Sequence, residues 1–130
     1  MKREIKFRAM TKANNVMVFG DVIVCPNGEH RMLWFELKGE NSLDLDYDSF
    51  NEVVQTSTIG QFTGLKDKNG IEIYEDDILK DVHFGYNTKV VYSGNQFVSE
   101  SNVGNVGLFE TENYEVIGNI FQNPDLLQSS

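Results

Sequence analysis

Residues 61–80 constrain the fold more than any other stretch, because they pack three turn signals and two short apolar runs into twenty positions. Asn69-Gly70 lies between two short β-like segments, and both of its residues tolerate a positive φ angle. This dipeptide therefore predicts a tight hairpin turn. A region so dense in turn signals and apolar runs is typical of a fixed β framework and not of a linker.

Short strands between turns account for most of the remaining chain. Alternation predicts a first strand over residues 5–10 and a last strand over residues 114–121. Segments 43–51 and 101–107 are expected to lack regular strands, the first as an exposed loop or short helical turn. Asn123-Pro124-Asp125 offers an N-cap, a proline at the first helical position and an acidic first turn, which predicts a short terminal helix. The other expected strands are 16–19, 22–24 (after a break at Gly20-Asp21), 31–37, 78–79 with 82–84, 88–92 and 96–98.

The strand spacing predicts a mainly β protein with a small barrel or sandwich. Two halves of about 60 residues would each be marginal alone, so we expect two packed subdomains. The boundary is placed between Asn51 and Gly60, giving an N-terminal β-rich subdomain (1–59) and a small C-terminal β-barrel domain (60–130). Acidic groups concentrate in the second, which has 4 basic and 11 acidic residues.

Charge and cysteine content limit the classes of function. The net charge of -9 and the sequence pI of about 4.6 argue against a general binder of phosphate backbones. Cys25 is the sole cysteine, so no internal disulfide is possible, which fits a reducing cytoplasm. The basic start, Met1–Arg8, has no apolar run behind it and is not a signal peptide. No apolar stretch approaches the roughly 20 residues of a membrane-spanning helix.

Four segments together resemble the YopX family of phage and prophage proteins. They frame nearly the whole chain: residues 3–9, 61–70, 72–80 and 114–127. The resemblance implies an all-β protein with a C-terminal barrel of the SH3 type, acting in the host cell cytoplasm. It transfers no activity, and therefore no catalytic, cofactor-binding or metal residues. This chain departs from the family pattern at Asp76, where a glycine is usual. Because Asp is among the few other residues that visit the left-handed region, we expect the turn to survive.

Two acidic clusters are candidate cation sites. Asp44, Asp46 and Asp48 have the spacing of the first ligands of a calcium loop, but Ser49 and Gln55 replace the glycine and the glutamate that such a loop needs at positions 6 and 12. Glu75, Asp76 and Asp77 form the second cluster, beside a turn signal, where we expect exposure. Solvated surface is the simpler interpretation of both clusters.

No other motif indicates catalysis. His30 and His83 are the only histidines, and no Cys-x-x-Cys motif accompanies them to suggest zinc. Cys25 sits in a turn and is interpreted as an incidental thiol. The sequence also lacks a phosphate-binding loop and the Gly-x-Ser-x-Gly signature of a serine nucleophile. We therefore assign no catalytic, cofactor-binding or metal residue.

Aromatic residues are numerous, and we expect core packing to explain most of them. Phe84-Gly85-Tyr86 and Arg31–Trp34 are the expected exposed exceptions. The leading hypothesis is a non-enzymatic module that binds a phage or host protein or another copy of itself, without a membrane role. The alternative is nucleic-acid binding through the basic first strand (Lys2, Arg3, Lys6, Arg8 and Lys12) and exposed aromatics. A third hypothesis is an enzyme with a cryptic carboxylate site.

Overall fold

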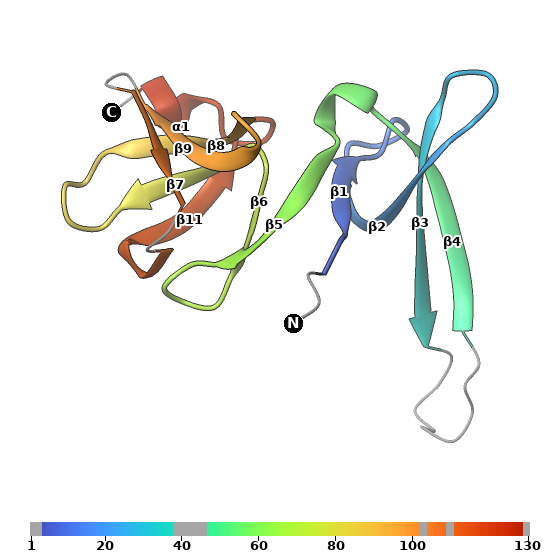
Figure 1. The fold of residues 1–130 in the computed structure, drawn as a ribbon. Coiled ribbons are helices and arrows are strands. Elements are labelled where there is room, and N and C mark those ends of the chain that lie inside the picture. The colour runs from blue at the N-terminus through green and yellow to red at the C-terminus, as the bar shows by residue number, and fades with distance from the viewer. Residues whose placement is uncertain (1–3, 38–46, 102–103, 109–110, 129–130) are drawn as a thin grey trace. The chain divides into compact units, whose positions relative to one another are not determined.

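The computed structural model describes residues 4–37, 47–101, 104–108 and 111–128 (Figure 1). The chain divides into two compact units, which we call the N-terminal unit (Lys6–Gly60) and the C-terminal unit (Gln61–Ser130 with Met1–Ile5). The strands form two antiparallel sheets, and one short α-helix accompanies them, so the expected mainly β class is confirmed. Strand pairing among the described residues does not close a barrel, and the barrel stays a prediction.

In the N-terminal unit, β1 (Phe7–Met10), β2 (Met17–Val24), β3 (His30–Leu37) and β4 (Tyr47–Val54) lie in the order β4-β3-β2-β1. The end of β4 returns to the segment after β1. There the Lys12 N–H donates to the Val53 carbonyl at 2.9 Å, and the Gln55 N–H donates to the Met10 carbonyl at 2.9 Å. A 3-10 turn, η1 (Thr56–Thr58), follows, and its Thr58 hydroxyl accepts the Met10 N–H. The small core consists of Ala9, Met32 and Val54, with Phe7, Val18, Val22, Trp34 and Ile59 packed against them.

Two expectations for this unit are wrong. β2 continues through Gly20, where a break was expected, because glycine lets the neighbouring strand approach: a Cβ atom there would lie 2.2 Å from the Leu33 carbonyl oxygen. Residues 47–51, which were expected in a loop or helical turn, belong to β4. Pairing with β3 along the whole strand supplies the hydrogen bonds, and Tyr47, Phe50 and Val53 are β formers that offset the interspersed Asp48, Ser49 and Asn51.

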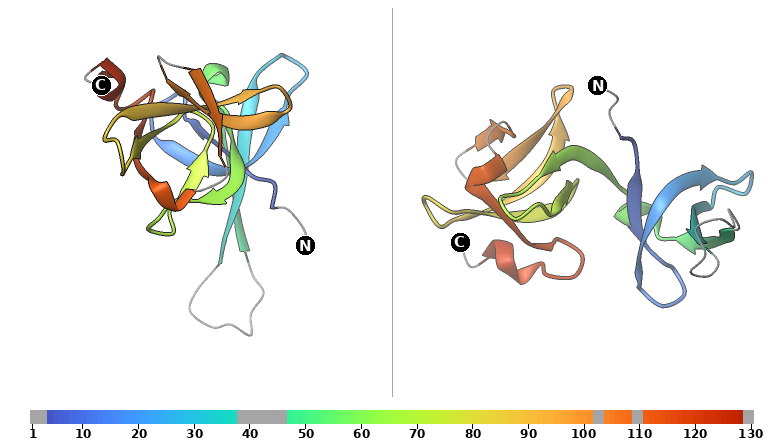
Figure 2. Two further views of the ribbon diagram at one scale, coloured as in Figure 1. Left: turned by 60° about the vertical axis from the view of Figure 1, so that its left-hand side comes forward. Right: turned by 90° about the horizontal axis from the view of Figure 1, so that it is seen from below.

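In the C-terminal unit, β5 (Gly60–Lys66) pairs with β6 (Glu72–Tyr74) as a hairpin. The second sheet has the order β10-β9-β8-β7-β11 (Figure 2). It contains β7 (Asp77–Asp81), β8 (Asn87–Ser93), β9 (Gln96–Ser101), β10 (Gly104–Gly107) and β11 (Tyr114–Asn119). A 3-10 turn, η2 (Thr111–Asn113), precedes β11. The core gathers Ile73, Leu79, Val90, Leu108 and Tyr114.

The expected turn chemistry of the C-terminal unit is largely confirmed. The β5–β6 hairpin turns at Asn69-Gly70, with φ +80° at Gly70 alone. The Gly70 N–H donates to the Asp67 carbonyl, so the turn is centred one residue earlier than a two-residue Asn-Gly loop would be. Asp76 has φ +72°, as its place in the family pattern predicts. The expected terminal helix forms as α1 (Asp125–Gln128).

Two further expectations are wrong. Residues 104–107 form β10, because β9 supplies a partner for this polar, glycine-containing segment. Residues 82–84 were expected in a strand, but β7 ends at Asp81. The Asp81 carboxylate accepts the amides of His83 and Phe84, and these bonds turn the chain. Among the described residues, no helix has the length and apolar character to cross a membrane.

Candidate functional site

The carboxylates of the C-terminal unit act inside the fold, and Asp67 is the clearest example. Its side chain is 7% exposed. Oδ1 accepts the amides of Asn69 and Ile71 at 2.8 and 2.9 Å, and Oδ2 accepts the Val116 amide at 2.9 Å. One carboxylate therefore shapes the β5–β6 turn and joins it to β11. These three bonds give the Asp67 carboxylate a structural role, so its presence in the turn does not require a bound cation.

The cluster Glu75, Asp76 and Asp77 has the same character. Asp77 is 1% exposed, and its Oδ2 accepts the Tyr74 amide at 2.7 Å, while Glu75 Oε1 accepts the Gln61 amide at 3.2 Å. Glu75 and Asp76 are half-buried. The expected exposure is therefore wrong for Asp77, whose carboxylate bonds a turn amide inside the fold, and Glu75 and Asp76 are only partly exposed. Asp76 is held through its backbone, which bonds Val90 and Ile120.

The other acidic cluster is only partly described. Asp44 and Asp46 lie outside the described residues, and Asp48 is an exposed residue of β4. Across the part of the chain that the structure describes, no group of three or more His, Cys, Asp or Glu side chains is arranged to hold a metal ion. Cation binding at either cluster remains untested.

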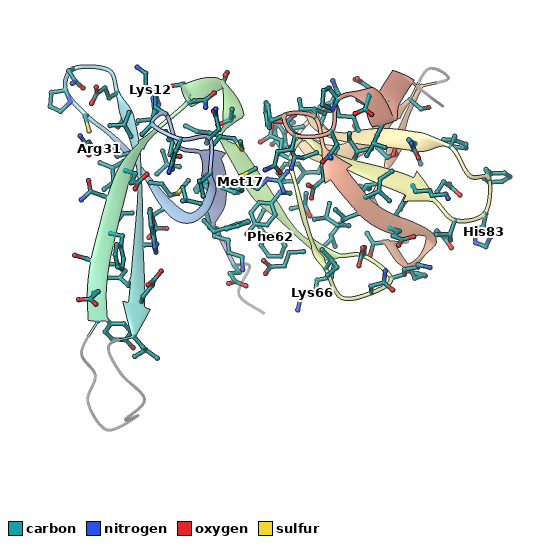
Figure 3. The ribbon with its side chains drawn as sticks, turned by 180° about the vertical axis from the view of Figure 1, so that it is seen from behind. Lys12, Met17, Arg31, Phe62, Lys66 and His83 are labelled. Carbon is teal, nitrogen blue, oxygen red and sulfur yellow. The ribbon has the colours of Figure 1, made fainter. Side chains whose placement is uncertain are left out.

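The two histidines serve different loops. In the N-terminal unit, His30 Nδ1 lies 3.0 Å from the Thr56 hydroxyl. In the C-terminal unit, His83 stands at the outer end of the β7–β8 loop, with Nε2 2.8 Å from Asn113 Oδ1 (Figure 3). Cys25 is a half-buried free thiol. His30, the first residue of β3, thus bonds the 3-10 turn η1, and His83 bonds Asn113 from a surface loop.

The basic residues form a weaker surface than the sequence suggests. Lys2 and Arg3 lie outside the described residues, Arg8 is 7% exposed, and Lys12 is exposed. Arg31 and Lys12 line a shallow cleft of about 480 Å³ in the N-terminal unit.

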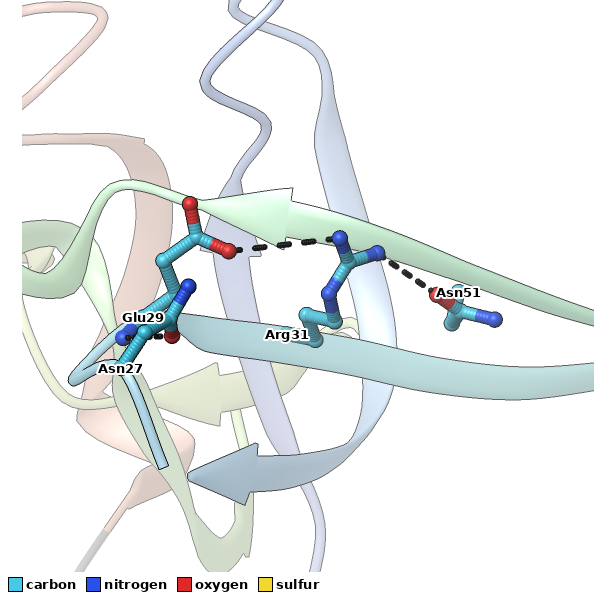
Figure 4. Close-up of polar contacts among 4 residues, drawn as sticks. All are labelled: Asn27, Glu29, Arg31 and Asn51. Atoms are coloured by element: carbon cyan, nitrogen blue, oxygen red, sulfur yellow. Dashed lines mark hydrogen bonds and ion pairs between the residues drawn. The ribbon is translucent and has the colours of Figure 1, made fainter. Parts of the chain in front are cut away.

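Arg31 is engaged by its own neighbours in that cleft. Its Nη1 donates to Asn51 Oδ1 at 2.8 Å, and its Nη2 lies 4.0 Å from Glu29 (Figure 4). Burial of Arg8 and these two contacts reduce what the N-terminal unit can offer to phosphates. Nucleic-acid binding stays an untested prediction.

The β7–β8 loop presents two exposed rings of the C-terminal unit. Phe84 is 77% exposed and Tyr86 is 36% exposed, and their rings stack with centroids 6.2 Å apart at 20°. The His83 ring meets Phe84 edge-on at 6.5 Å. The predicted exposure of Phe84-Gly85-Tyr86 is confirmed. We call this pair, with the loop that carries it, the aromatic tip.

Asp81 holds the aromatic tip in one shape. Its Oδ1 accepts the amides of His83 and Phe84 at 2.9 and 3.0 Å. Its backbone bonds both Gly85 and Tyr86, at 2.7 and 2.9 Å, and Gly85 takes φ +78° to close the loop. Four backbone groups of a short loop, three amides and one carbonyl, are therefore satisfied around one buried aspartate, so the rings are exposed on an ordered backbone.

Tyr114 of β11 pairs with Asp81 of β7 and is 8% exposed. Burial raises the pKa of its hydroxyl above the ordinary value near 10, a hydrogen bond with Ser99 opposes the shift, and the nearby Asp81 carboxylate adds to it.

Core packing explains fewer rings than expected. Phe62, Tyr74 and Tyr114 are buried. Other aromatic side chains are exposed, among them Phe19, Phe35, Phe84, Tyr86 and Tyr92. Phe109 lies outside the described residues. Within the expected exposed segment Arg31–Trp34, Met32 is fully buried, because it alternates onto the core face of β3. The role of Asp81 in shaping the aromatic tip was missed in the sequence. The signal that could have indicated it is an Asp at the end of a strand, two residues before the loop amides that it bonds.

Comparison with known proteins supplies the family. Residues 6–128 match the sequence profile of the family described as YopX protein. Among solved structures, the crystal structure of protein EF1440 from Enterococcus faecalis is 29% identical, with a TM-score of 0.63 over 97% of this chain and 99% of that chain. A search of curated proteins finds no match. Since the family profile covers nearly the whole length, the chain belongs to the YopX family.

Proposed function

We propose that this chain is a non-enzymatic protein-interaction module of phage or prophage origin, which docks on a protein partner through the aromatic tip. The observation that carries the proposal is the stacked pair Phe84 and Tyr86, exposed to solvent on a loop that Asp81 holds in one shape. Aromatic side chains dominate the binding energy of protein interfaces when they fill a partner's pocket. A loop that is already ordered loses little conformational entropy on binding.

The charge of the C-terminal region indicates the partner's chemistry. Residues 60–130 carry a net charge of -7, with 4 basic and 11 acidic groups. We therefore propose an apolar pocket for the rings, with basic side chains around it, on a phage or host protein in the reducing cytoplasm. Opposite charges at the rim speed association and are screened by salt.

The proposal extends to the form of the C-terminal unit, as a small barrel of the SH3 type. Two bonds, one from the β5–β6 turn and one from the turn after β6, reach different strands of the second sheet and support it. Lys68 N–H donates to the Tyr114 carbonyl at 3.1 Å, on β11, and Asp76 N–H donates to the Val90 carbonyl at 2.8 Å, on β8. Such a barrel would present the β7–β8 loop as one of its rim loops.

A capture experiment with matched variants tests the proposed function. The purified chain is immobilised and exposed to lysate of the bacterial host, beside Phe84→Ser and Tyr92→Ser. Tyr92 is also an exposed ring of the C-terminal unit, 56% exposed, but it lies on β8 outside the aromatic tip. We expect a partner that the wild type and Tyr92→Ser retain and that Phe84→Ser retains at least about tenfold less.

The variants must keep their melting temperature, which the exposure of Phe84 predicts. Equal retention of the partner by Phe84→Ser would contradict the proposal, as would a wild-type chain that retains nothing. Weaker capture at higher salt is expected from the acidic charge of the unit.

A further inference from the structure

The outer face of the N-terminal sheet breaks the rule that antiparallel sheets alternate between apolar inward and polar outward side chains. Met32 and Trp34 of β3 point to the core. Their neighbours Leu33, Phe35 and Leu37 therefore point outward, and Phe35 and Leu37 are 59% and 63% exposed.

The strands opposite continue this apolar surface. Tyr47 of β4 pairs directly with Leu37 and is 53% exposed, and Ile23 of β2 pairs with Arg31 and is 41% exposed. We call the surface formed by Ile23, Leu33, Phe35, Leu37 and Tyr47 the outer face. Its members share one side of the sheet with two charged residues, Asp21 opposite Leu33 and Arg31 opposite Ile23, and beyond these only apolar and uncharged polar residues follow on β3 and β4.

Three of the five residues of the outer face, Phe35, Leu37 and Tyr47, lie on a two-stranded ribbon. β3 pairs with β2 only over His30–Leu33, whereas it pairs with β4 along its whole length. Residues 34–37 and 47–50 therefore extend past β2, as Figure 1 shows within this unit. An isolated two-stranded ribbon is marginally stable in water, and its stability rises when a further layer covers it. The Trp34–Phe50 stack, with centroids 5.6 Å apart, supports the other side of the ribbon.

Charge is segregated between the two sides of this ribbon. The core side carries Glu36 and Asp48, which lie directly opposite one another, and Glu52. The outer side carries no charged group from Leu33 to Leu37 or from Tyr47 to Asn51. Two copies of a chain with net charge -9 repel each other. They can meet without bringing Glu36 and Asp48 together if they use the outer side of the ribbon, where Phe35, Leu37, Tyr47 and Ser49 are uncharged.

From these observations we infer that the outer face is the contact surface of a homodimer, in which the ribbons of two copies pack face to face about a two-fold axis. The same apolar side chains then cover one another, and four strands replace two. The inference concerns a different surface from the aromatic tip and does not depend on the proposed partner.

The area is sufficient for a modest dimer. The exposed parts of Ile23, Phe35, Leu37 and Tyr47 amount to about 400 Å² in each copy, since such side chains expose about 150–250 Å² in full. The apolar side chains of two copies would then bury about 800 Å², and polar neighbours such as Ser49 and Asn51 raise this toward the roughly 1,200 Å² at the lower end of specific interfaces. A dimer of this size dissociates on dilution.

Sedimentation velocity on the full chain tests the dimer, between about 1 and 200 µM, where contacts of this size dissociate. We expect the mass to rise from 14.8 kDa toward twice that value with concentration. Phe35→Asp and, separately, Leu37→Asp should raise the dissociation constant at least about tenfold, because each places charge in the apolar contact. Circular dichroism should show an unchanged fold, since both side chains are largely exposed.

Phe84→Ser is the matched control, because it removes an exposed ring of the other unit. It should leave the dimer intact, whereas Phe35→Asp should leave capture through the aromatic tip intact, so the two proposals fail separately. A wild type that stays at 14.8 kDa throughout, or an oligomer that both aspartate variants leave unchanged, would overturn the inference.

Discussion

In the C-terminal unit, Asp67, Asp77 and Asp81 are nearly buried and bond the amides of turns, whereas in the N-terminal unit the charged residues Glu36 and Asp48 lie on an exposed ribbon. The C-terminal unit uses its carboxylates to fix loops. The N-terminal unit is held by strand pairing and leaves large apolar side chains exposed to water. The acidic residues of this chain therefore have two roles, as acceptors for turn amides and as exposed charges, and neither role requires a catalytic site.

Loss of the Asp67 carboxylate should have the largest effect. Asp67→Ala leaves three amides without their acceptor in a buried place, and we expect a loss of about 3–5 kcal/mol in the free energy of unfolding. Urea unfolding measures it. The matched control is Lys68→Ala, an exposed neighbour that should change stability by less than about 0.5 kcal/mol. Equal stabilities of the two variants would show that the carboxylate does not hold the turn.

Gly20→Ala tests the N-terminal unit. The new Cβ atom would lie 2.2 Å from the Leu33 carbonyl oxygen, which is backbone and cannot move aside alone, so we expect a loss of about 2–3 kcal/mol. Trp34 is the single tryptophan and lies in this unit, so its fluorescence during urea unfolding reports the change. Gly28→Ala is the control, because space is open there and only the strain of φ +88°, about 1 kcal/mol, applies. A larger loss in Gly28→Ala would refute the close approach at Gly20.

Gly70→Val tests the hairpin turn of the C-terminal unit. Gly70 has φ +80° and open space around its Cβ position, so the expected loss of about 1–2 kcal/mol is backbone strain alone. Gly70→Asn should lose less, because asparagine tolerates the left-handed region. Melting temperatures measured by circular dichroism give the comparison. An unchanged melting temperature in Gly70→Val would mean that the turn is not held in this conformation.

The smallest expected effect is a pH dependence from Tyr114. Burial raises its pKa in the folded state above the ordinary value near 10, so the neutral hydroxyl is favoured by folding. The contribution to stability is complete below pH 10 and is lost as the pH rises toward the folded pKa. Unfolding measured from pH 8 to 11 should show a decline that Tyr114→Phe reduces. Identical profiles for the two proteins would exclude the contribution.

The sequence predicted the C-terminal unit better than the N-terminal one, for a physical reason. Turns such as Asn69-Gly70 and the left-handed Asp76 are set by local backbone preferences, which a sequence displays. β4 and the continuity of β2 at Gly20 depend on partner strands, which a sequence does not display. The aromatic tip was predicted because its glycine lies between two rings. The outer face was missed, because Phe35 and Leu37 alternate with core residues and look like part of a core strand.

Amide hydrogen exchange at His83 and Phe84 tests most directly the claim that buried carboxylates order the loops that present exposed rings. Both amides donate to Asp81 Oδ1 in a loop at the surface. We predict that both amides exchange slowly in the wild type and that their protection falls at least about tenfold in Asp81→Ala. The amide of Val90, a fully buried residue of β8, should keep the same protection in both proteins. Exchange at His83 and Phe84 as fast as in an unstructured loop, in the wild type, would contradict the account.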